Sequence, residues 1–265
     1  MIGIFDSGYG GLTVMKEIVR VLPQYDYLYL GDNARTPYGN RSTETVTQFS
    51  REAVEFLFKA GAQMIIFACY TASALALREL QKEYPDRKIL GVIRPVVEKA
   101  AKTSRNGMIG VTGTRGTIAS NTFVTELHNQ KPGLRVFQQA CPLLVPLIEE
   151  NWHKKPEAQM ILKKYLRPLK SKNIDTLILG CTHYSVMMKD FKRMMGKRIQ
   201  VLDSGKIVAE SLRDYLKRHP EIEKKLTRDG GRKFCTTDDT ERFKVFTEAF
   251  WSVKVNDLSK VTLTQ

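Results

Sequence analysis

The amino-acid sequence predicts an α/β fold in which parallel-type sheets are covered by helices. Several short apolar runs end in small or polar residues, and segments with helical periodicity follow them. Such strand–loop–helix units are typical of parallel sheets, whose strands are buried on both faces. Ligands of these folds bind at the carboxyl ends of the strands. The polar residues that end the apolar runs are therefore the candidates for a functional site.

The apolar runs predict strands at residues 2–5, 27–30, 64–68, 88–93, 108–111, 176–179 and 199–202. Helical periodicity predicts helices at residues 12–22, at residues 72–84, and from about residue 206 to residue 216. The stretch 219–233 is charged and contains glycine, which predicts an exposed loop.

Sequence similarity between the two halves of the chain indicates two related domains. Residues 2–8 resemble residues 199–205, and residues 64–69 resemble residues 176–181. Each half of the chain thus has one thiol directly after a buried strand. The alternative is a chance similarity between strands that are all rich in Val, Ile and Leu. Two related domains that face each other would place Cys69 and Cys181 across one cleft.

The composition is that of a globular protein. The 265 residues are 42% hydrophobic and 26% charged, which excludes a disordered tail or a collagen-like repeat. The longest apolar stretch, residues 64–70, is far shorter than the roughly 20 residues that span a bilayer, so we expect no membrane segment. No basic leader precedes the first apolar run, which predicts a cytoplasmic protein with four free thiols. None of the cysteines forms a CxxC pair, so we expect no structural zinc site.

The positive charge is concentrated in one third of the chain. The net charge is +14, and residues 151–235 alone carry 21 basic against 9 acidic side chains. Such a field attracts anions, from small carboxylates to nucleic acid. The alternative is a solvated helix face, because Lys163, Lys164, Arg167 and Lys170 have the spacing of a helix surface.

Two of the four cysteines stand where chemistry is expected. Cys69 and Cys181 each follow a strand and precede polar residues, whereas Cys141 and Cys235 have the surroundings of inert core residues. A thiol at a helix N-terminus has a lowered pKa, and His183 is placed to exchange a proton with Cys181. Two opposed thiols suit the removal of a proton from one face of a carbon acid and its return to the other face. Disulfide exchange and cysteine hydrolysis are the alternatives.

Motifs along the whole chain resemble those of glutamate racemases, in the cofactor-independent aspartate/glutamate racemase superfamily. They are GIFDSGYGGL (residues 3–12), YLGDNARTPYG (29–39), ACYTASA (68–74), GTRGT (113–117), VPLIEE (145–150), GCTHY (180–184) and TTD (236–238). The resemblance implies two pseudo-symmetric α/β domains with the active site in the cleft between them. The first domain would hold residues 1–95 and 210–265 and the second residues 96–209.

The resemblance also implies the activity. The protein would be an isomerase that interconverts L- and D-glutamate and supplies the D-isomer for peptidoglycan, and hence for cell wall biogenesis and cell shape. It would use no cofactor and no metal. The family is commonly dimeric, so a homodimer is expected. Some members are reported to bind DNA gyrase, but the basic helices here lack interleaved aromatic residues and a recognised nucleic-acid motif.

Individual roles follow by matching motif positions. Cys69 would act on the α-hydrogen of D-glutamate with help from Asp6, and Cys181 on that of L-glutamate with help from His183. Glu149 matches a further acidic residue of the pattern, and the adjacent Glu150 is the alternative register. The substrate-binding residues would be Asp6, Ser7, Pro37, Tyr38, Gly39, Tyr70, Thr71, Thr114, Thr117, Thr182 and His183.

The chemistry of these residue types fits glutamate, which carries two carboxylates and one ammonium. Hydroxyl and backbone N–H groups donate to carboxylates, and Asp6 or Glu149 can accept from an ammonium. The glycines around Ser7 and before residue 12 predict a nest of N–H groups for an anion. Asp32 is either a site residue or a turn residue.

The chain departs from the family pattern at two places. Tyr70 stands where the family usually has Asn, and Arg94-Pro95-Val96 replaces Glu-Pro-Gly. A phenol has one O–H in place of two N–H donors, so we hypothesise that Tyr70 lowers glutamate racemisation or shifts substrate preference. The alternatives for function are a racemase of another amino acid such as aspartate, a weakly active homologue, or a binding protein with a regulatory role.

Overall fold

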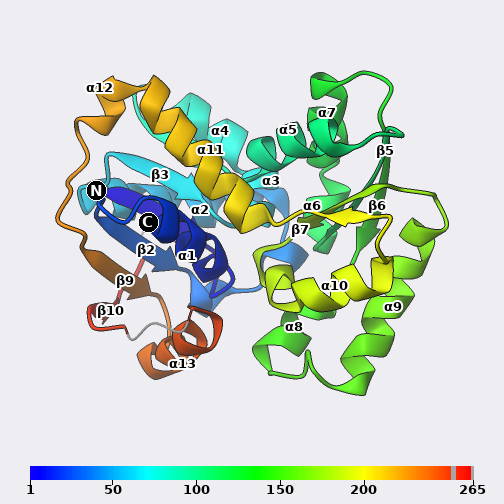
Figure 1. Ribbon diagram of the computed structural model, residues 1–265. Coiled ribbons are helices and arrows are strands. Elements are labelled where there is room, and N and C mark those ends of the chain that lie inside the picture. Colours follow the sequence, from blue (N-terminus) through cyan, green and yellow to red (C-terminus); the bar gives the residue numbers. More distant parts are fainter. Residues whose placement is uncertain (252–254, 264–265) are drawn as a thin grey trace.

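The computed structural model describes residues 1–251 and 255–263, and its strands form two parallel sheets (Figure 1). The first sheet has the order β10 (Leu258–Lys260), β9 (Arg232–Thr236), β2 (Tyr27–Gly31), β1 (Ile2–Asp6), β3 (Met64–Phe67) and β4 (Lys88–Gly91). The second has the order β6 (Arg135–Ala140), β5 (Met108–Gly113), β7 (Thr176–Gly180) and β8 (Gln200–Val201). The predicted fold class is confirmed.

The two sheets repeat one topology. The order β2-β1-β3-β4 in the first sheet recurs as β6-β5-β7-β8 in the second. Cys69 follows β3 and Cys181 follows β7, so the two thiols have equivalent places in the two sheets. The sequence similarity between residues 64–69 and 176–181 therefore reflects equivalent strands. The similarity between residues 2–8 and 199–205 does not, because β8 is at the position in the second sheet that β4, and not β1, has in the first.

Helices cover both faces of the first sheet. Alternate side chains of β1, such as Ile4, face α1 (Leu12–Val21) and α11 (Ser204–Arg218), while Phe5 faces α2 (Thr43–Lys59). We call this part the first lobe: β1–β4, β9 and β10 with α1, α2, α3 (Tyr70–Leu75), α4 (Leu77–Glu83), α12 (Pro220–Glu223) and α13 (Thr240–Trp251). The short 3-10 turns η1 (Asn33–Arg35) and η2 (Tyr38–Asn40) follow β2.

The second lobe contains β5–β8 and the helices around them. These are α6 (Arg115–Ala119), α7 (Thr122–Gln130), α8 (Leu144–Glu149), α9 (Pro156–Lys170), η3 (Thr182–Met187) and α10 (Met188–Met195). On α9, Leu162 and Leu166 are buried and the lysines 163 and 164 are exposed, so these basic residues form a solvated helix face, as one of the two interpretations predicted. No helix in the described ranges is both long and apolar enough to cross a membrane.

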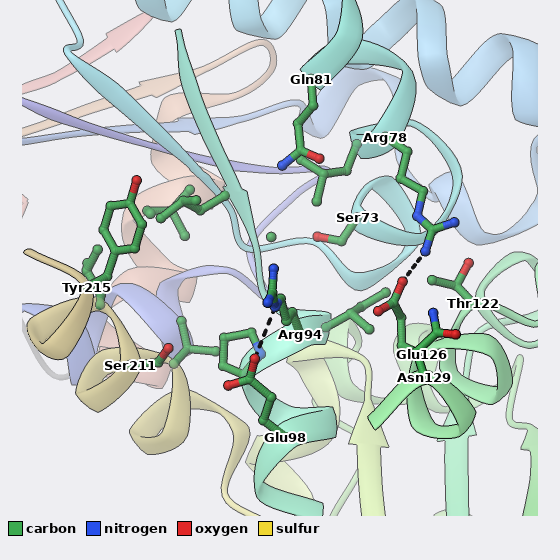
Figure 2. A pocket seen from close by; sticks show the side chains of 18 of the residues that line it. Ser73, Arg78, Gln81, Arg94, Glu98, Thr122, Glu126, Asn129, Ser211 and Tyr215 are labelled. Atoms are coloured by element: carbon green, nitrogen blue, oxygen red, sulfur yellow. Dashed lines mark hydrogen bonds and ion pairs between the residues drawn. The ribbon is translucent and has the colours of Figure 1, made fainter. Parts of the chain in front are cut away.

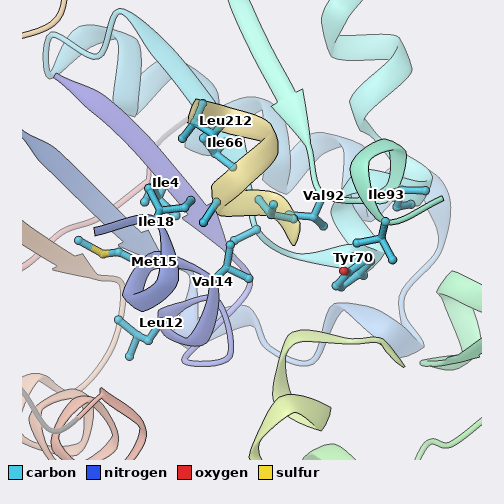
Figure 3. Close-up of a cluster of buried hydrophobic side chains, with 14 of the residues drawn as sticks. Ile4, Leu12, Val14, Met15, Ile18, Ile66, Tyr70, Val92, Ile93 and Leu212 are labelled. Carbon is cyan, nitrogen blue, oxygen red and sulfur yellow. The ribbon is translucent and has the colours of Figure 1, made fainter. Parts of the chain in front are cut away.

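Two helices connect the lobes and share a core with both. The chain leaves the first sheet through α5 (Ile93–Thr103) and returns to it through α11 (Figure 1). One hydrophobic cluster includes Ile4 and Ile66 of the first sheet, which Figure 3 labels, and also Val111 and Ile178 of the second sheet. The predicted domain boundaries, at residues 95–96 and 209–210, fall within these helices and stay predictions.

The structure differs from the predicted elements near the C-terminus. The stretch 219–233 is not wholly an exposed loop, because it contains α12 and the first residues of β9. Ile222 and Leu226 are buried in the core and hold it against the first lobe. The hydroxyl of Tyr25 also donates to Glu223 at 2.6 Å. The prediction of an exposed loop overlooked these apolar residues, because each stands alone among charged residues.

Candidate active site

Both candidate thiols line one small cavity between the lobes. The cavity has a volume of about 30 Å³ and is lined by Ser7, Thr36, Pro37, Tyr38, Gly39, Cys69, Tyr70, Thr71, Thr114, Val145, Cys181, Thr182 and His183. Cys69 and Cys181 are 5% and 7% exposed, so both thiols are almost wholly withdrawn from bulk solvent. The arrangement required by the two-thiol chemistry, a single cavity shared by both sulfur atoms, is present.

Cys69 lies at the end of β3 and caps α3. Its Sγ accepts from the backbone N–H of Ala72 at 3.5 Å and lies 3.3 Å from Oγ of Ser7. Burial, and then the Asp6 carboxylate, raise the pKa of the Cys69 thiol to about 12. The lowered pKa that we predicted from the helix N-terminus is therefore wrong, because desolvation outweighs the contacts with Ser7 and Ala72.

Cys181 stands beside a buried His–Glu pair. Nδ1 of His183 is 4.0 Å from Sγ of Cys181, and Nε2 of His183 is 2.9 Å from Oε1 of Glu149. Burial alone would lower the pKa of His183, but the contacts with Cys181 and Glu149 outweigh it and raise the pKa to about 10. The raised pKa favours the imidazolium form of His183 at neutral pH, between Sγ of Cys181 and the carboxyl group of Glu149. Glu150 is exposed and pairs with Arg242, so of the two adjacent carboxylates it is Glu149 that contacts His183.

Asp6 is buried at the end of β1, and its own loop surrounds it. Its Oδ2 accepts from the backbone N–H of Gly8 at 2.9 Å, and a backbone N–H bond from Gly11 also favours the ionised form. Burial nevertheless raises the pKa of Asp6. The nest that we predicted for an external anion is therefore occupied by the side chain of Asp6. Its Oδ1 has no hydrogen-bond partner in the described part of the chain.

Two glycines let the lobes approach at the cavity. A Cβ on Gly10 would lie 2.3 Å from Oγ1 of Thr182 and 2.4 Å from Nδ1 of His183. A Cβ on Gly39 would lie 2.5 Å from Cβ of Thr114. No side chain fits at such distances, so the first-lobe loops need glycine at both positions.

Hydroxyl groups from both lobes meet on one wall of the cavity. Oγ1 of Thr71 lies 2.9 Å from Oγ1 of Thr114 and 3.2 Å from Oγ1 of Thr117. Thr114 and Thr71 line the cavity, but Thr117 is fully buried behind them. Asp6 and Glu149 also lie behind the lining residues. These predicted site residues would thus act through the residues that line the cavity.

The phenol of Tyr38 is not free for a ligand. Its hydroxyl donates to the carboxylate of Asp32, and the side chain is 1% exposed. Pro37 and Gly39 have no polar side-chain group, so any polar contact that these residues and Tyr38 make with a ligand would come from their backbone groups. The predicted substrate-binding segment does line the cavity.

The ring of Tyr70 lies in the core between the lobes. It is 2% exposed and stacks on Phe123 of α7 with ring centroids 5.9 Å apart, and Figure 3 places it beside Val92 and Ile93. Burial raises the pKa of Tyr70. Its hydroxyl, which faces Ser204, has no hydrogen-bond partner among residues 1–251 and 255–263. Tyr70 thus forms part of the cavity wall and extends from there into the interlobe core.

A larger pocket of about 740 Å³ lies between α4, α5, α7 and α11 and contains neither thiol (Figure 2). Arg94 is in the first turn of α5, where it pairs with Glu98 at 3.0 Å, and Arg78 pairs with Glu126 of α7. The departure from the family pattern at Arg94 therefore falls in this pocket and away from the thiols.

Sequence reasoning did not assign two of the residues that line the cavity. Thr36 and Val145 both line it. Both belong to motifs that carried the resemblance, but nothing in their residue types distinguished them from their neighbours. Thr13 was also missed: its hydroxyl contacts the carbonyl groups of Gly10 (2.8 Å) and Thr182 (3.2 Å), which ties α1 to η3.

The family described as Asp/Glu/Hydantoin racemase matches residues 2–212. Because this match covers most of the chain, the protein belongs to that family. Its relatives give a narrower assignment. The chain is 39% identical to glutamate racemase of Geobacter metallireducens over 262 residues, which cover 99% of this chain and 96% of that protein.

Solved structures agree with this assignment. Glutamate racemase isoform RacE1 of Bacillus anthracis superposes with a TM-score of 0.93 at 37% identity, over 99% of this chain and 97% of that one. Glutamate racemase of Francisella tularensis, solved in complex with D-glutamate, superposes with a TM-score of 0.90 at 32% identity, over 99% and 97%. The resemblance stated from the motifs is confirmed.

Proposed function

We propose that this protein is a glutamate racemase that interconverts L- and D-glutamate by moving protons between two thiols, without a cofactor. The observation that carries this proposal is the shared cavity of Cys69 and Cys181, in which each thiol has a different acid–base partner. Glutamate as substrate is supported by the names of the relatives and by the D-glutamate in the Francisella protein. The alternative of a racemase for another amino acid is not favoured by these relatives.

From D-glutamate, the reaction proceeds in two proton transfers. The Cys69 thiolate takes the α-hydrogen as a proton and leaves a carbanion whose charge spreads onto the α-carboxylate. The Cys181 thiol then gives a proton to the opposite face of the α-carbon, which yields L-glutamate. Cys69 ends as a thiol and Cys181 as a thiolate, which is the form that starts the reverse reaction.

His183 is placed to exchange a proton with Cys181. Its Nδ1 faces Sγ of Cys181, and Glu149 stabilises a positive charge on the imidazole from the other side. When Cys181 must be a thiol, His183 can supply the proton. We assign His183 as the acid–base partner of Cys181 and Glu149 as the residue that positions His183.

The group beside Cys69 is a carboxyl group, that of Asp6, whereas the group beside Cys181 is the imidazole of His183. The carboxylate of Asp6 raises the pKa of the Cys69 thiol, and burial raises that of Asp6, so the two groups do not both ionise easily. A proton leaving Cys69 can therefore pass to Asp6 before the thiolate removes the α-hydrogen of D-glutamate. The ammonium of bound substrate would further lower the cost of a thiolate at this place.

The hydroxyl and backbone N–H groups around the cavity would hold the charged groups of glutamate. Ser7, Thr71, Thr114 and Thr182 have hydroxyls at the wall, and residues 36–39 have backbone groups there. Ligand pockets usually have about 300–1,000 Å³, so a cavity of about 30 Å³ is a closed form of the site. The loops from the two lobes must therefore separate for glutamate to enter.

The biological setting follows from the product. D-glutamate made by this enzyme would supply peptidoglycan synthesis and thereby maintain the cell wall and cell shape. A cytoplasmic location is supported by the four free cysteines, two of which must stay reduced. We also propose that the protein acts as a homodimer, as is common in the family.

The test is incubation with L- or D-glutamate in D₂O, with deuterium uptake and optical inversion followed together. Cys69→Ser and Cys181→Ser should each lose racemisation by about 10²–10⁴-fold, because each removes the acid–base group for one face. Cys235→Ser is the matched control, since this thiol is buried beside Ser259, outside the cavity. Unchanged racemisation in either cavity variant would overturn the proposed mechanism.

A further inference from the structure

Asp32 is a fully buried carboxylate at the end of β2 that receives three side-chain hydrogen bonds. Its Oδ2 accepts from Nε of Arg35 at 2.7 Å and from the hydroxyl of Tyr38. Its Oδ1 accepts from Oγ1 of Thr237 at 2.9 Å. A residue that only forms a turn does not need three side-chain donors. Of the two interpretations of Asp32, a turn residue or a site residue, the structure therefore favours a site residue.

Two of the donors, Arg35 and Tyr38, lie in the loop after β2, and the third, Thr237, comes from the far end of the chain. Arg35 also pairs with Glu52 of α2, and its guanidinium lies 4.0 Å above the ring of Phe49. Thr237 follows β9, about 200 positions away in the sequence, and its Oγ1 additionally accepts from the backbone N–H of Ala34 at 3.0 Å. Asp32 thus joins the loop after β2 both to α2 and to the C-terminal part of the chain.

This network ends at the catalytic cavity but does not enter it. Residues 36–39 line the cavity, whereas Asp32, Arg35 and Thr237 do not. The connection to the cavity is the phenol of Tyr38. Directly after it, the backbone of Gly39 packs against Thr114 of the second lobe, so the position of this loop also sets how the lobes meet.

We propose that Asp32 is a positioning residue that holds the loop of residues 36–39 in the shape that binds a carboxylate of the substrate. The inference rests on the proposed function. A buried carboxylate retains its donors because an unpaired charge is costly in the interior. The three donors are therefore fixed around Asp32, and through Tyr38 they fix the backbone groups that face the substrate.

The test compares Asp32→Asn with wild type in steady-state racemisation of both enantiomers. The neutral amide has one acceptor oxygen and loses at least one bond of the charge-assisted kind, so KM should rise about tenfold for both enantiomers. The loop holds substrate equally before and during proton transfer, so kcat should change little. Thr237→Val, which removes a single donor, should raise KM by a smaller factor.

A double-mutant cycle separates positioning from general damage. In the Tyr38→Phe background the connection to the cavity is already broken, so Asp32→Asn should add little to KM. The matched control is Asp175→Asn, because Asp175 also accepts several bonds, from Oγ of Ser104 and from the N–H of Asn106, but lies far from the cavity lining. This control should lower stability without changing KM.

Several outcomes would overturn the inference. They are an unchanged KM in folded Asp32→Asn, an equal rise in the Asp175→Asn control, or full additivity with Tyr38→Phe. Calorimetric titration with D-glutamate keeps this test apart from that of the proposed function. A wild type that binds D-glutamate without racemising it overturns the proposed function alone, and the Kd of Asp32→Asn then decides the positioning role: a tenfold weaker Kd supports it and an unchanged Kd overturns it.

Discussion

Replacement of Tyr70 by Asn, the residue usual at this place in the family, should destabilise the protein. The ring of Tyr70 is 2% exposed and stacks on Phe123 between the lobes. Asn at this position would leave the space of the ring empty and bring a buried amide next to apolar neighbours such as Ile93. The two lobes would lose contact at the core they share.

The magnitude follows from the size of the group removed. Truncation of a buried aromatic ring to Ala costs about 3–5 kcal/mol, and the loss of an unpartnered hydroxyl returns about 1 kcal/mol. Asn is larger than Ala and fills part of the space, which offsets the cost of its buried amide, so we expect a loss of about 3 kcal/mol. At about 2–4 °C per kcal/mol for a chain of this size, the Tm should fall by about 6–12 °C.

The assay is thermal and urea unfolding of the wild type, Tyr70→Asn and Tyr70→Phe. The Phe variant keeps the ring and removes only the hydroxyl, which has no hydrogen-bond partner among the described residues, so it should be as stable as wild type or slightly more stable. An Asn variant as stable as wild type would refute this reasoning about the ring, and a clearly less stable Phe variant would refute the assignment of the hydroxyl. The earlier hypothesis, that Tyr70 limits racemisation, predicts a higher kcat/KM for the Asn variant among molecules that remain folded.

Two further predictions concern the Cys181 side of the site. Because the pKa of folded His183 is raised from 6.5 to about 10, its contribution to stability is complete below pH 6.5 and is lost as the pH rises towards 10. Glu149→Gln should move this loss to lower pH, measured by urea unfolding at a series of pH values, and an unmoved profile would contradict the pairing. Gly10→Ala would press a methyl group against Thr182 and His183, so it should lower kcat by at least about tenfold in both directions. Gly8→Ala, whose Cβ has only ordinary contacts, should have a much smaller effect, and equal losses would count against the steric argument.

Most of the strands that sequence reasoning found are buried on both faces; the exceptions are the edge strands β4 and β8. Residues 64–67 and 176–179 are continuous apolar runs, and they form β3 and β7. The strand β6, with the sequence RVFQQA, was not predicted, because it is a half-buried edge strand in which polar residues occupy three of the six positions. The strand predicted at residues 199–202 is shortened to the two residues of β8, whereas β9 and β10, which join the first sheet from the far end of the chain, were not predicted.

The composition of the site was predicted better than its electrostatics. The motifs predicted that Cys69, Cys181 and His183 lie at one cavity, because each thiol follows a strand at the carboxyl edge of its own sheet and the two lobes meet at these edges. The direction of the pKa of Cys69 was wrong, because burial depends on how completely the second lobe covers the first. Likewise, no local pattern could reveal that Tyr38 donates to Asp32 or that the ring of Tyr70 lies between the lobes.

The unequal neighbours of the two sulfur atoms, a carboxyl group beside Cys69 and an imidazolium beside Cys181, limit how the forward and reverse reactions can differ. Mirror-image amino acids have the same free energy in water, so the equilibrium constant is one and kcat/KM must be identical in both directions. Any advantage that this asymmetry gives to one isomer at saturating concentration is therefore cancelled by weaker apparent binding of that same isomer. The asymmetry determines which isomer the enzyme converts faster when it is saturated with substrate. It does not determine which isomer accumulates.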